Sequence, residues 1–275
     1  MIGNGHDRQT PPYPTVPHLS RIVSWFSCGV ASAVATKLAI EANAKKAEPL
    51  PLVVARCWVA EEDEDNDRFA ADCRKWFGVP IFPLTSNEYA GSIYNVFEDV
   101  RFISGPKGAP CTRELKKAVR ERFQRPGDIH VFGYTADEPH RWNQLLDANN
   151  DIQTWDVLGE RNLTHKDCLA IVERAGIRLP DQYIRGFEHN NCLACVKATS
   201  PDYWRMVRFH HPAAFKRMAD ACQPGALTTN GARLVRVKGE RILLHDLPDG
   251  DFDPSSQGTV QCGIFCELAE KEIAA

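Results

Sequence analysis

Short apolar runs alternate with amphipathic stretches along the first two-thirds of the chain. The apolar run 21–25 leads through a turn at 26–29 into the alanine-rich stretch 31–44, which predicts a strand, a tight turn and a helix. Further strands are expected at 50–59, 81–84, 129–133 and 152–158, and further helices at 67–77, 92–100, 113–123, 137–148 and 165–175. Strands that alternate with helices predict an α/β fold with a mostly parallel, doubly wound sheet.

The pattern changes after Pro180. An aromatic stretch at 201–222 predicts a helix, and the alternating residues 233–244 predict a β-hairpin. A cysteine turn precedes them at 191–195. We therefore expect three regions, which are a proline-rich extended arm over 1–20, an α/β domain over 21–180, and a cysteine-rich helical and hairpin appendage over 181–275.

Composition narrows the class of protein. The chain has 275 residues, of which 43% are hydrophobic, and this is enough to bury a substantial core. Its formal net charge of -3 gives no global positive field for nucleic acid. The sequence has neither an apolar stretch of membrane-spanning length nor a secretory signal, so we expect a cytoplasmic protein without a membrane partner. The ten cysteines then favour metal binding or redox chemistry over a disulfide framework.

The turn after the first strand is a candidate phosphate-binding loop. Its small residues allow backbone N–H groups and a helix N-terminus to face an anion, and Ser27 and Ser32 add hydroxyl groups. The alternative is an ordinary turn between strand and helix, with small residues for packing. A second segment, 133–141, follows a later strand, where Glu138 and Arg141 either cap a helix or orient a nucleotide.

Six carboxylates occupy the seven positions 61–67, at the end of the second expected strand. Carboxylate oxygens suit Mg²⁺, so the run is a candidate magnesium site. The alternative, which we favour, is a solvated loop whose last members cap the following helix.

The cysteines form the stronger chemical signal. Cys192 and Cys195 are spaced to bind one metal from a single turn, and Cys262 and Cys266 form a second close pair. Thiolates bind zinc and iron–sulfur clusters alike, so the residues leave this choice open. Cys111 lies near a helix N-terminus beside basic residues, which stabilise a thiolate that acts as ligand or reactive group. Four more are expected to be core residues: Cys57, Cys73, Cys168 and Cys222.

In this order, the segments from Arg21 to Cys266 resemble the phosphoadenosine-phosphosulfate (PAPS) reductase family. That family belongs to the adenine-nucleotide α-hydrolase-like superfamily, with the pyrophosphatase-loop ATPases. The resemblance implies a nucleotide site formed by Ser27, Cys28, Gly29, Ala31, Ser32, Arg113, Lys116, Gly133, Glu138 and Arg141. Residues 28–31 lack the lysine and aspartate of the superfamily's ATP-cleaving loops, which argues against ATP cleavage more than against sulfonucleotide binding.

The resemblance also implies an oxidoreductase mechanism. Cys262 would attack the sulfur of a sulfonucleotide (PAPS or APS), and a thiol reductant such as thioredoxin would release the product. Cys111, Cys192, Cys195 and Cys266 would hold a 4Fe-4S cluster or zinc, although Cys262 and Cys266 are close enough to be a ligand pair instead.

Two other functions stay open at this point. The first is a pyrophosphatase-loop sulfurtransferase that thiolates a nucleic acid or nucleobase, with a basic face on the helix 113–125. The second is a nucleotide-binding, zinc-stabilised module without catalysis.

Overall fold

The structure, a computed structural model, describes residues 20–105 and 108–257. The expected N-terminal arm, apart from Ser20, lies outside the described residues, and so do Cys262 and Cys266. Within the described ranges, no helix combines the length and the apolar character that crossing a bilayer requires.

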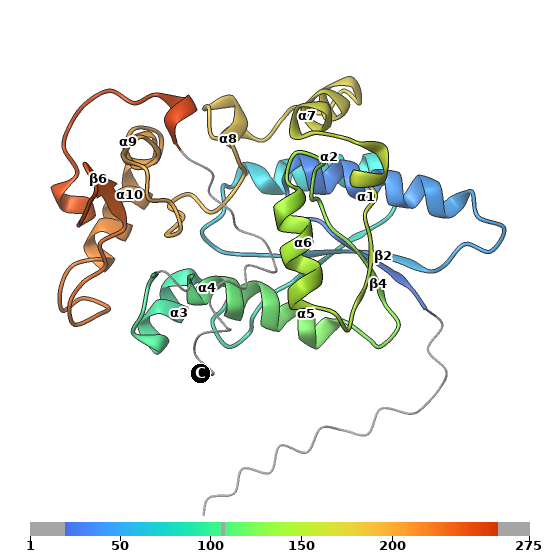
Figure 1. The fold of residues 1–275 in the computed structure, drawn as a ribbon, viewed down its shortest axis with the longest axis horizontal. Helices are drawn as coiled ribbons and strands as arrows, with labels where there is room; N and C mark the ends of the chain where they lie inside the picture. The colour runs from blue at the N-terminus through green and yellow to red at the C-terminus, as the bar shows by residue number, and fades with distance from the viewer. Residues whose placement is uncertain (1–19, 106–107, 258–275) are drawn as a thin grey trace, which may run out of the picture.

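A five-stranded parallel sheet forms the centre of the fold (Figure 1). Its strands are β1 (Ile22–Trp25), β2 (Leu52–Cys57), β3 (Ile81–Leu84), β4 (Ile129–Val131) and β5 (Gln153–Trp155). Their spatial order is β3-β2-β1-β4-β5, so the direction of winding reverses between β1 and β4. The expected parallel α/β sheet is confirmed. In such sheets a crevice opens outside the carboxyl ends of the strands at this reversal.

Helices cover both faces of the sheet because every strand is buried on both sides. On one face, Ile22 and Phe26 pack toward α1 (Val30–Ala44), α2 (Asp65–Phe77) and α7 (His165–Arg174). On the other, Val23 and Trp25 pack with residues of α5 (Ala118–Phe123) and α6 (Pro139–Ala148). Figure 1 shows α1, α2 and α7 together on one side of the sheet and α5 on the opposite side.

The segment expected as one helix over 113–123 is broken into three. It begins as α4 (Pro110–Thr112), continues as the π-helix η1 (Arg113–Lys117), and ends as α5. A π-helix is rare and appears mostly as a single turn within α-helical structure, frequently at functional sites. Nothing in the residue pattern of this segment indicates the wider turn.

Short helices and a hairpin make up the second half of the chain. These are α8 (Asp181–Ile184), α9 (Pro201–His210), α10 (Pro212–Ala221), and the antiparallel strands β6 (Val235–Val237) and β7 (Glu240–Ile242). Three 3-10 turns complete the described structure: η2 (Gly159–Arg161), η3 (Leu244–Asp246) and η4 (Pro254–Ser256). The single helix expected over 201–222 is wrong, because Pro212 has no N–H to continue α9 and instead begins α10.

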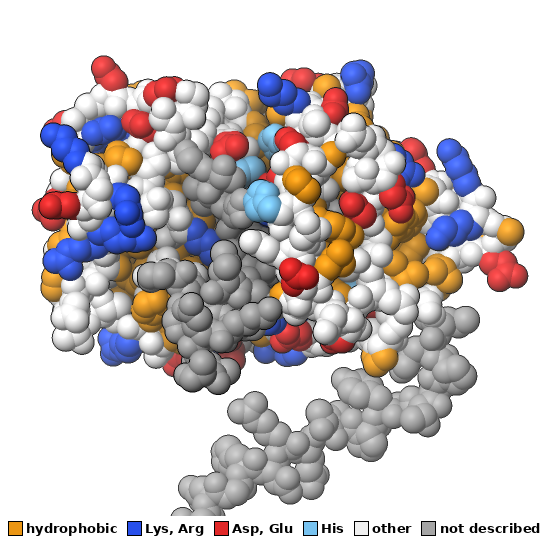
Figure 2. Space-filling view, in the orientation of Figure 1, with side chains coloured by type: hydrophobic (Ala, Val, Ile, Leu, Met, Phe, Trp, Pro, Cys, Tyr) orange, Lys and Arg blue, Asp and Glu red, His pale blue; other side chains and the backbone are white. Residues whose placement is uncertain are grey.

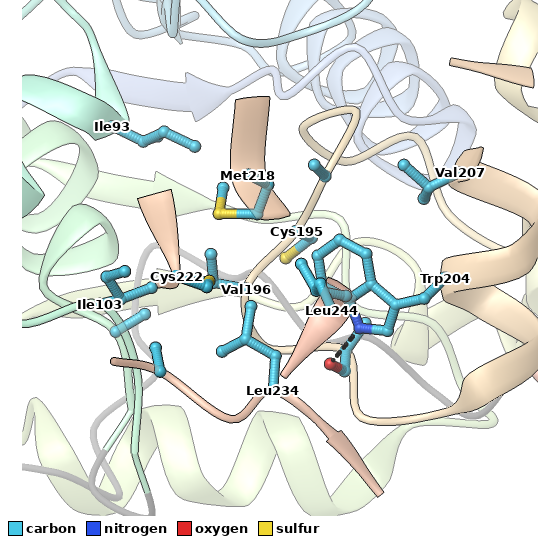
Figure 3. Packing of buried hydrophobic residues seen from close by; sticks show 14 of the residues in the cluster. Ile93, Ile103, Cys195, Val196, Trp204, Val207, Met218, Cys222, Leu234 and Leu244 are labelled. Carbon is cyan, nitrogen blue, oxygen red and sulfur yellow. Dashed lines mark hydrogen bonds between the residues drawn. The ribbon is translucent and has the colours of Figure 1, made fainter. Parts of the chain in front are cut away.

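One hydrophobic cluster joins this second half to the sheet domain. It combines Trp204, Met218 and Leu244 with Ile93 of α3 (Ile93–Val100) and with Ile103 (Figure 3). The indole N–H of Trp204 donates to the carbonyl of Ala198 at 2.9 Å, so the buried ring leaves no polar atom unpaired. The four cysteines expected in the core are confirmed as buried: Cys57, Cys73, Cys168 and Cys222.

His130 is a buried titratable group on β4. The indole N–H of Trp25 donates to its Nδ1 at 3.0 Å, and the imidazole is 1% exposed. Burial lowers the pKa of His130 from 6.5 to about 4, so the ring is neutral in the folded protein at neutral pH.

We expect His130 to make folding sensitive to acid. Between its unfolded and folded pKa values only the unfolded chain takes up this proton, so the free energy of unfolding falls as pH falls. Lowering the pH from about 7 to about 5 removes about 2 kcal/mol through this group. Urea unfolding at both pH values measures the loss, and His130→Gln removes that part of it. An equal pH dependence in wild type and variant would contradict the assignment.

Candidate functional site

A pocket opens at the reversal of strand order, and we call it the switch-point pocket. Seven residues predicted from the sequence line it: Ser27, Gly29, Ala31, Ser32, Gly133, Glu138 and Arg141. The pocket has a volume of about 80 Å³, which suits a phosphate-sized group. The two segments that sequence analysis singled out after β1 and β4 therefore meet at one place.

The turn after β1 is held in an unusual backbone geometry. Cys28 has a φ of 59°, in the left-handed region that non-glycine residues rarely adopt. The side-chain amide of Asn190 donates to the Cys28 carbonyl at 2.7 Å and stabilises this turn. The Cys28 thiol points into the core near the carbonyl of Asn66, and burial raises its pKa well above the usual value. The predicted nucleotide contact of Cys28 is thus restricted to its backbone.

Hydroxyl groups order the start of α1. Ser32 Oγ accepts hydrogen bonds from the Ser27 backbone N–H and hydroxyl, and donates to the Gly29 carbonyl at 2.8 Å. The N–H of Val30 donates to the hydroxyl of Tyr183 at 3.4 Å. Ala31 and Ser32 lie in the first turn, where helix N–H groups have no intrahelical acceptor. The positive end of the helix dipole therefore faces the pocket, a favourable place for an anion.

The segment after β4 forms the opposite wall. An added Cβ at Gly133 would lie 2.4 Å from the Ser32 backbone nitrogen, so only glycine allows this close approach. Glu138 accepts hydrogen bonds from the Thr135 hydroxyl and from the Arg141 guanidinium. Arg141 also lies 4.8 Å from the ring centre of Tyr134. These contacts hold one guanidinium at the mouth of the pocket.

Sequence reasoning missed five of the lining residues: His165, Tyr183, His189, Asn190 and Asn191. The polar run immediately before Cys192 was a usable signal for the last three. His165 and Tyr183 had none, because each is a single polar residue in an otherwise ordinary helical stretch.

A larger cavity of about 560 Å³ adjoins the switch-point pocket. Both share Glu138, His165, Tyr183 and His189 as lining residues. Leu169, Leu179 and Phe187 add apolar surface to the cavity. Its volume and mixed lining are typical of a site for a small organic molecule.

Two histidines lie between the cavity and the pocket. The rings of His165 and His189 are 5.7 Å apart, edge to face. Burial lowers the pKa of His189, and the neighbouring His165 and Arg141 lower it further, while Glu188 and Glu138 oppose the shift. His189 Nε2 is buried without a hydrogen-bond partner among the described residues. A neutral imidazole here can give or accept one hydrogen bond from a ligand.

Two predicted nucleotide residues are not among those that line the pocket. Arg113 is exposed on η1 and forms an ion pair with Glu114. Lys116 is buried, close to Glu62. Arg120 is buried as well, so the basic face expected over 113–125 loses two of its cations.

The acidic run 61–67 connects the sheet to the second half of the chain. Asp63 accepts from Arg185 at 2.7 Å, and Asp65 accepts from Arg178 at 2.9 Å. Glu61 accepts from the Ser92 hydroxyl at 2.7 Å and lies 3.7 Å from Arg217.

Glu62 is more deeply placed, 3.3 Å from Arg56. Burial raises the pKa of Glu62, while Lys116 and Arg56 act to lower it. The favoured interpretation of a solvated loop is therefore wrong for Glu61, Glu62, Asp63 and Asp65, whose side chains are at most 12% exposed. A magnesium ion at this run would have to displace these contacts.

Three of the predicted metal ligands lie against one hydrophobic cluster. Cys195 belongs to it, and Cys111 and Cys192 pack against it. The turn that carries the pair is fixed by a hydrogen bond from the Leu193 N–H to the Glu61 carbonyl and by one from the Cys195 N–H to Tyr203 Oη. No three His, Cys, Asp or Glu side chains within 20–105 and 108–257 form a group able to hold a metal. The predicted catalytic Cys262 and the fourth predicted ligand, Cys266, lie outside those ranges.

The arrangement combines a helix N-terminus, serine hydroxyls and a guanidinium around a small pocket, beside a larger one lined by imidazoles. It is suited to an anionic group joined to an apolar, hydrogen-bonding body. No family model matches the chain, and no curated protein matches it in sequence.

Two glycines of the pocket give opposite expectations. Gly133→Ala should lower the free energy of unfolding by about 3 kcal/mol, because its Cβ collides with the α1 backbone. Gly29→Ala is the matched control, since its Cβ makes only ordinary contacts, 3.5 Å from Tyr183 Oη. Chemical denaturation of both variants measures the difference. If Gly133→Ala is as stable as wild type, the close approach between β4 and α1 is absent.

Proposed function

We propose that this chain is a sulfonucleotide reductase-like enzyme that binds an adenine nucleotide in the switch-point pocket. One observation carries the proposal: the loop after β1 and the segment after β4, each singled out beforehand, line a single phosphate-sized pocket. Under this proposal the sheet is of the adenine-nucleotide α-hydrolase-like type, with residues 181–275 as a cysteine-rich appendage.

The binding mode follows from the two adjoining volumes. A phosphate or sulfate group lies at the N-terminus of α1, where Arg141 and the Ser32 hydroxyl neutralise and orient it. The nucleoside lies in the adjoining cavity, against Leu169, Leu179 and Phe187. His189 Nε2 supplies one hydrogen bond there. The burial of Lys116 and the ion pair of Arg113 assign these two cations to support rather than to direct phosphate binding.

The chemical step belongs to Cys262. Its thiolate attacks the sulfur of the phosphosulfate, so that a sulfur–sulfur bond forms while the bond from sulfur to the bridging oxygen breaks. The nucleotide leaves with that oxygen on its phosphate. An external dithiol, such as thioredoxin, then attacks the cysteine sulfur, releases sulfite and becomes oxidised to a disulfide.

The cysteine turn is the proposed metal site. Cys111, Cys192, Cys195 and Cys266 offer four soft thiolate donors, which suits zinc or an iron–sulfur cluster. The bound group would add positive charge and fix the turn beside the nucleotide pocket. The same segment, 189–195, lines that pocket through His189, Asn190 and Asn191.

Arg141 should contribute to binding only through the charged part of the nucleotide. Arg141→Met is expected to weaken adenosine bisphosphate binding about tenfold, since a charge-assisted hydrogen bond is lost. Adenosine itself should bind as to wild type. Arg174→Met, on the exposed end of α7, is the matched control. Isothermal titration of the four combinations decides the matter. If neither ligand binds wild type, the nucleotide assignment fails.

Cys262 should form a covalent intermediate. Mixed with the phosphosulfate nucleotide in the absence of reductant, wild type should gain one sulfite-sized group by intact-mass measurement, and Cys262→Ser should gain none. Cys192→Ser should lose bound metal, whereas Cys222→Ser, at a buried core position, should retain it.

The controls separate the alternatives. Loss of metal in Cys262→Ser makes this residue a ligand and removes the nucleophile. Nucleotide binding without an adduct in wild type favours a non-catalytic module. ATP cleavage with a nucleic-acid acceptor favours the sulfurtransferase.

A further inference from the structure

A second groove lies away from the switch-point pocket, between the end of α3 and the hairpin β6–β7. Its volume is about 560 Å³, and it shares no lining residue with the switch-point pocket. One wall is formed by residues 101–105, and the other by residues 228–233 together with Arg241.

The groove is positively charged. Three arginines line it, Arg101, Arg233 and Arg241, and no carboxylate does. Within the described part of the chain none of the three forms an ion pair, although Arg241 donates to the Arg233 carbonyl at 3.2 Å. Arg236 and Lys238 are exposed on the same hairpin and extend the charge beyond the groove. Figure 2 shows Lys and Arg side chains gathered over the part of the molecule that carries β6. In a chain of net charge -3, this concentration is local.

An aromatic side chain lies at the edge of the groove. Phe102 is 44% exposed, among the few large apolar residues that reach solvent in the described structure. Its ring lies against Gly105, with a ring carbon 3.0 Å from the place a Cβ would occupy there. Arg101, next to it, has a φ of 52° at the C-cap of α3. The hydroxyls of Thr228 and Thr229 and the amide of Asn230 supply uncharged hydrogen-bonding groups.

We propose that this groove binds single-stranded nucleic acid. Guanidinium groups spread along a groove match successive phosphates, whereas a single small anion would require them to converge. An exposed aromatic ring beside them provides a stacking surface, which is how single strands are held without a base-pairing partner. The regularly stacked bases of a duplex offer Phe102 no free face. The groove therefore selects single strands, and this inference does not depend on the proposed reductase function.

The test uses the full chain and fluorescently labelled oligonucleotides of about 15 nucleotides, within the usual range of single-strand sites. Fluorescence anisotropy should show binding of single-stranded RNA or DNA and weaker binding of the same sequence as a duplex. Arg233→Glu/Arg241→Glu should weaken binding at least tenfold and flatten its salt dependence by roughly one unit of slope. Phe102→Ala should weaken it about tenfold with the salt dependence unchanged.

The matched control is Lys45→Glu/Arg74→Glu. It makes the same change of net charge at exposed positions on the C-cap of α1 and on α2, and should bind as wild type. Arg101→Gln provides a milder groove variant, should the double variant fail to fold by circular dichroism.

Three outcomes would overturn the proposal. In the first, wild type binds no oligonucleotide at low salt. In the second, groove and control variants lose affinity equally, which makes the effect one of net charge. In the third, an acidic peptide of equal charge competes as well as the oligonucleotide does, which makes the groove a protein-docking surface.

Discussion

The pairing of buried carboxylates with arginines at the end of β2 is the constraint on which the rest of the arrangement depends. A carboxylate withdrawn from water is costly unless a cation or hydrogen-bond donors meet it. Asp63 and Asp65 meet this requirement with Arg185 and Arg178, which lie more than a hundred residues further along the chain. The segment that starts at 178 is thereby held beside the sheet. This brings Tyr183, His189 and Asn190 to the mouth of the crevice that β1 and β4 open.

The central sheet could be predicted from sequence because its signals are local. Apolar runs and helix caps report on a few neighbouring residues, and the strand order then follows common rules for parallel sheets. Two features of the helices could not be predicted in this way. The π-helix at Arg113–Lys117 has no residue signature, and the break at Pro212 was hidden by a continuous amphipathic pattern.

The candidate site divides along the same line. Ser27, Ser32, Gly133 and Arg141 belong to loops that follow strands, where a parallel sheet collects its ligands, so their meeting could be anticipated. His165 and Tyr183 reach the pocket only through tertiary packing of α7 and α8. The acidic run shows the limit of composition as a guide. Its charge density suggested solvent, while its partners lay too far along the chain to be seen.

The hydrophobic cluster of Figure 3 has a consequence for synthesis of the protein. Ile93, Phe97 and Ile103 are fully or nearly fully buried, yet most of their surroundings come from residues 187–247. A chain emerging from the ribosome presents α3 long before Trp204 and Leu244 exist to cover it. The first half of the protein can assemble its sheet during translation, but its apolar edge stays wet until the second half arrives. Folding of this chain should therefore finish only after release, and the interval before that is its period of greatest exposure to aggregation.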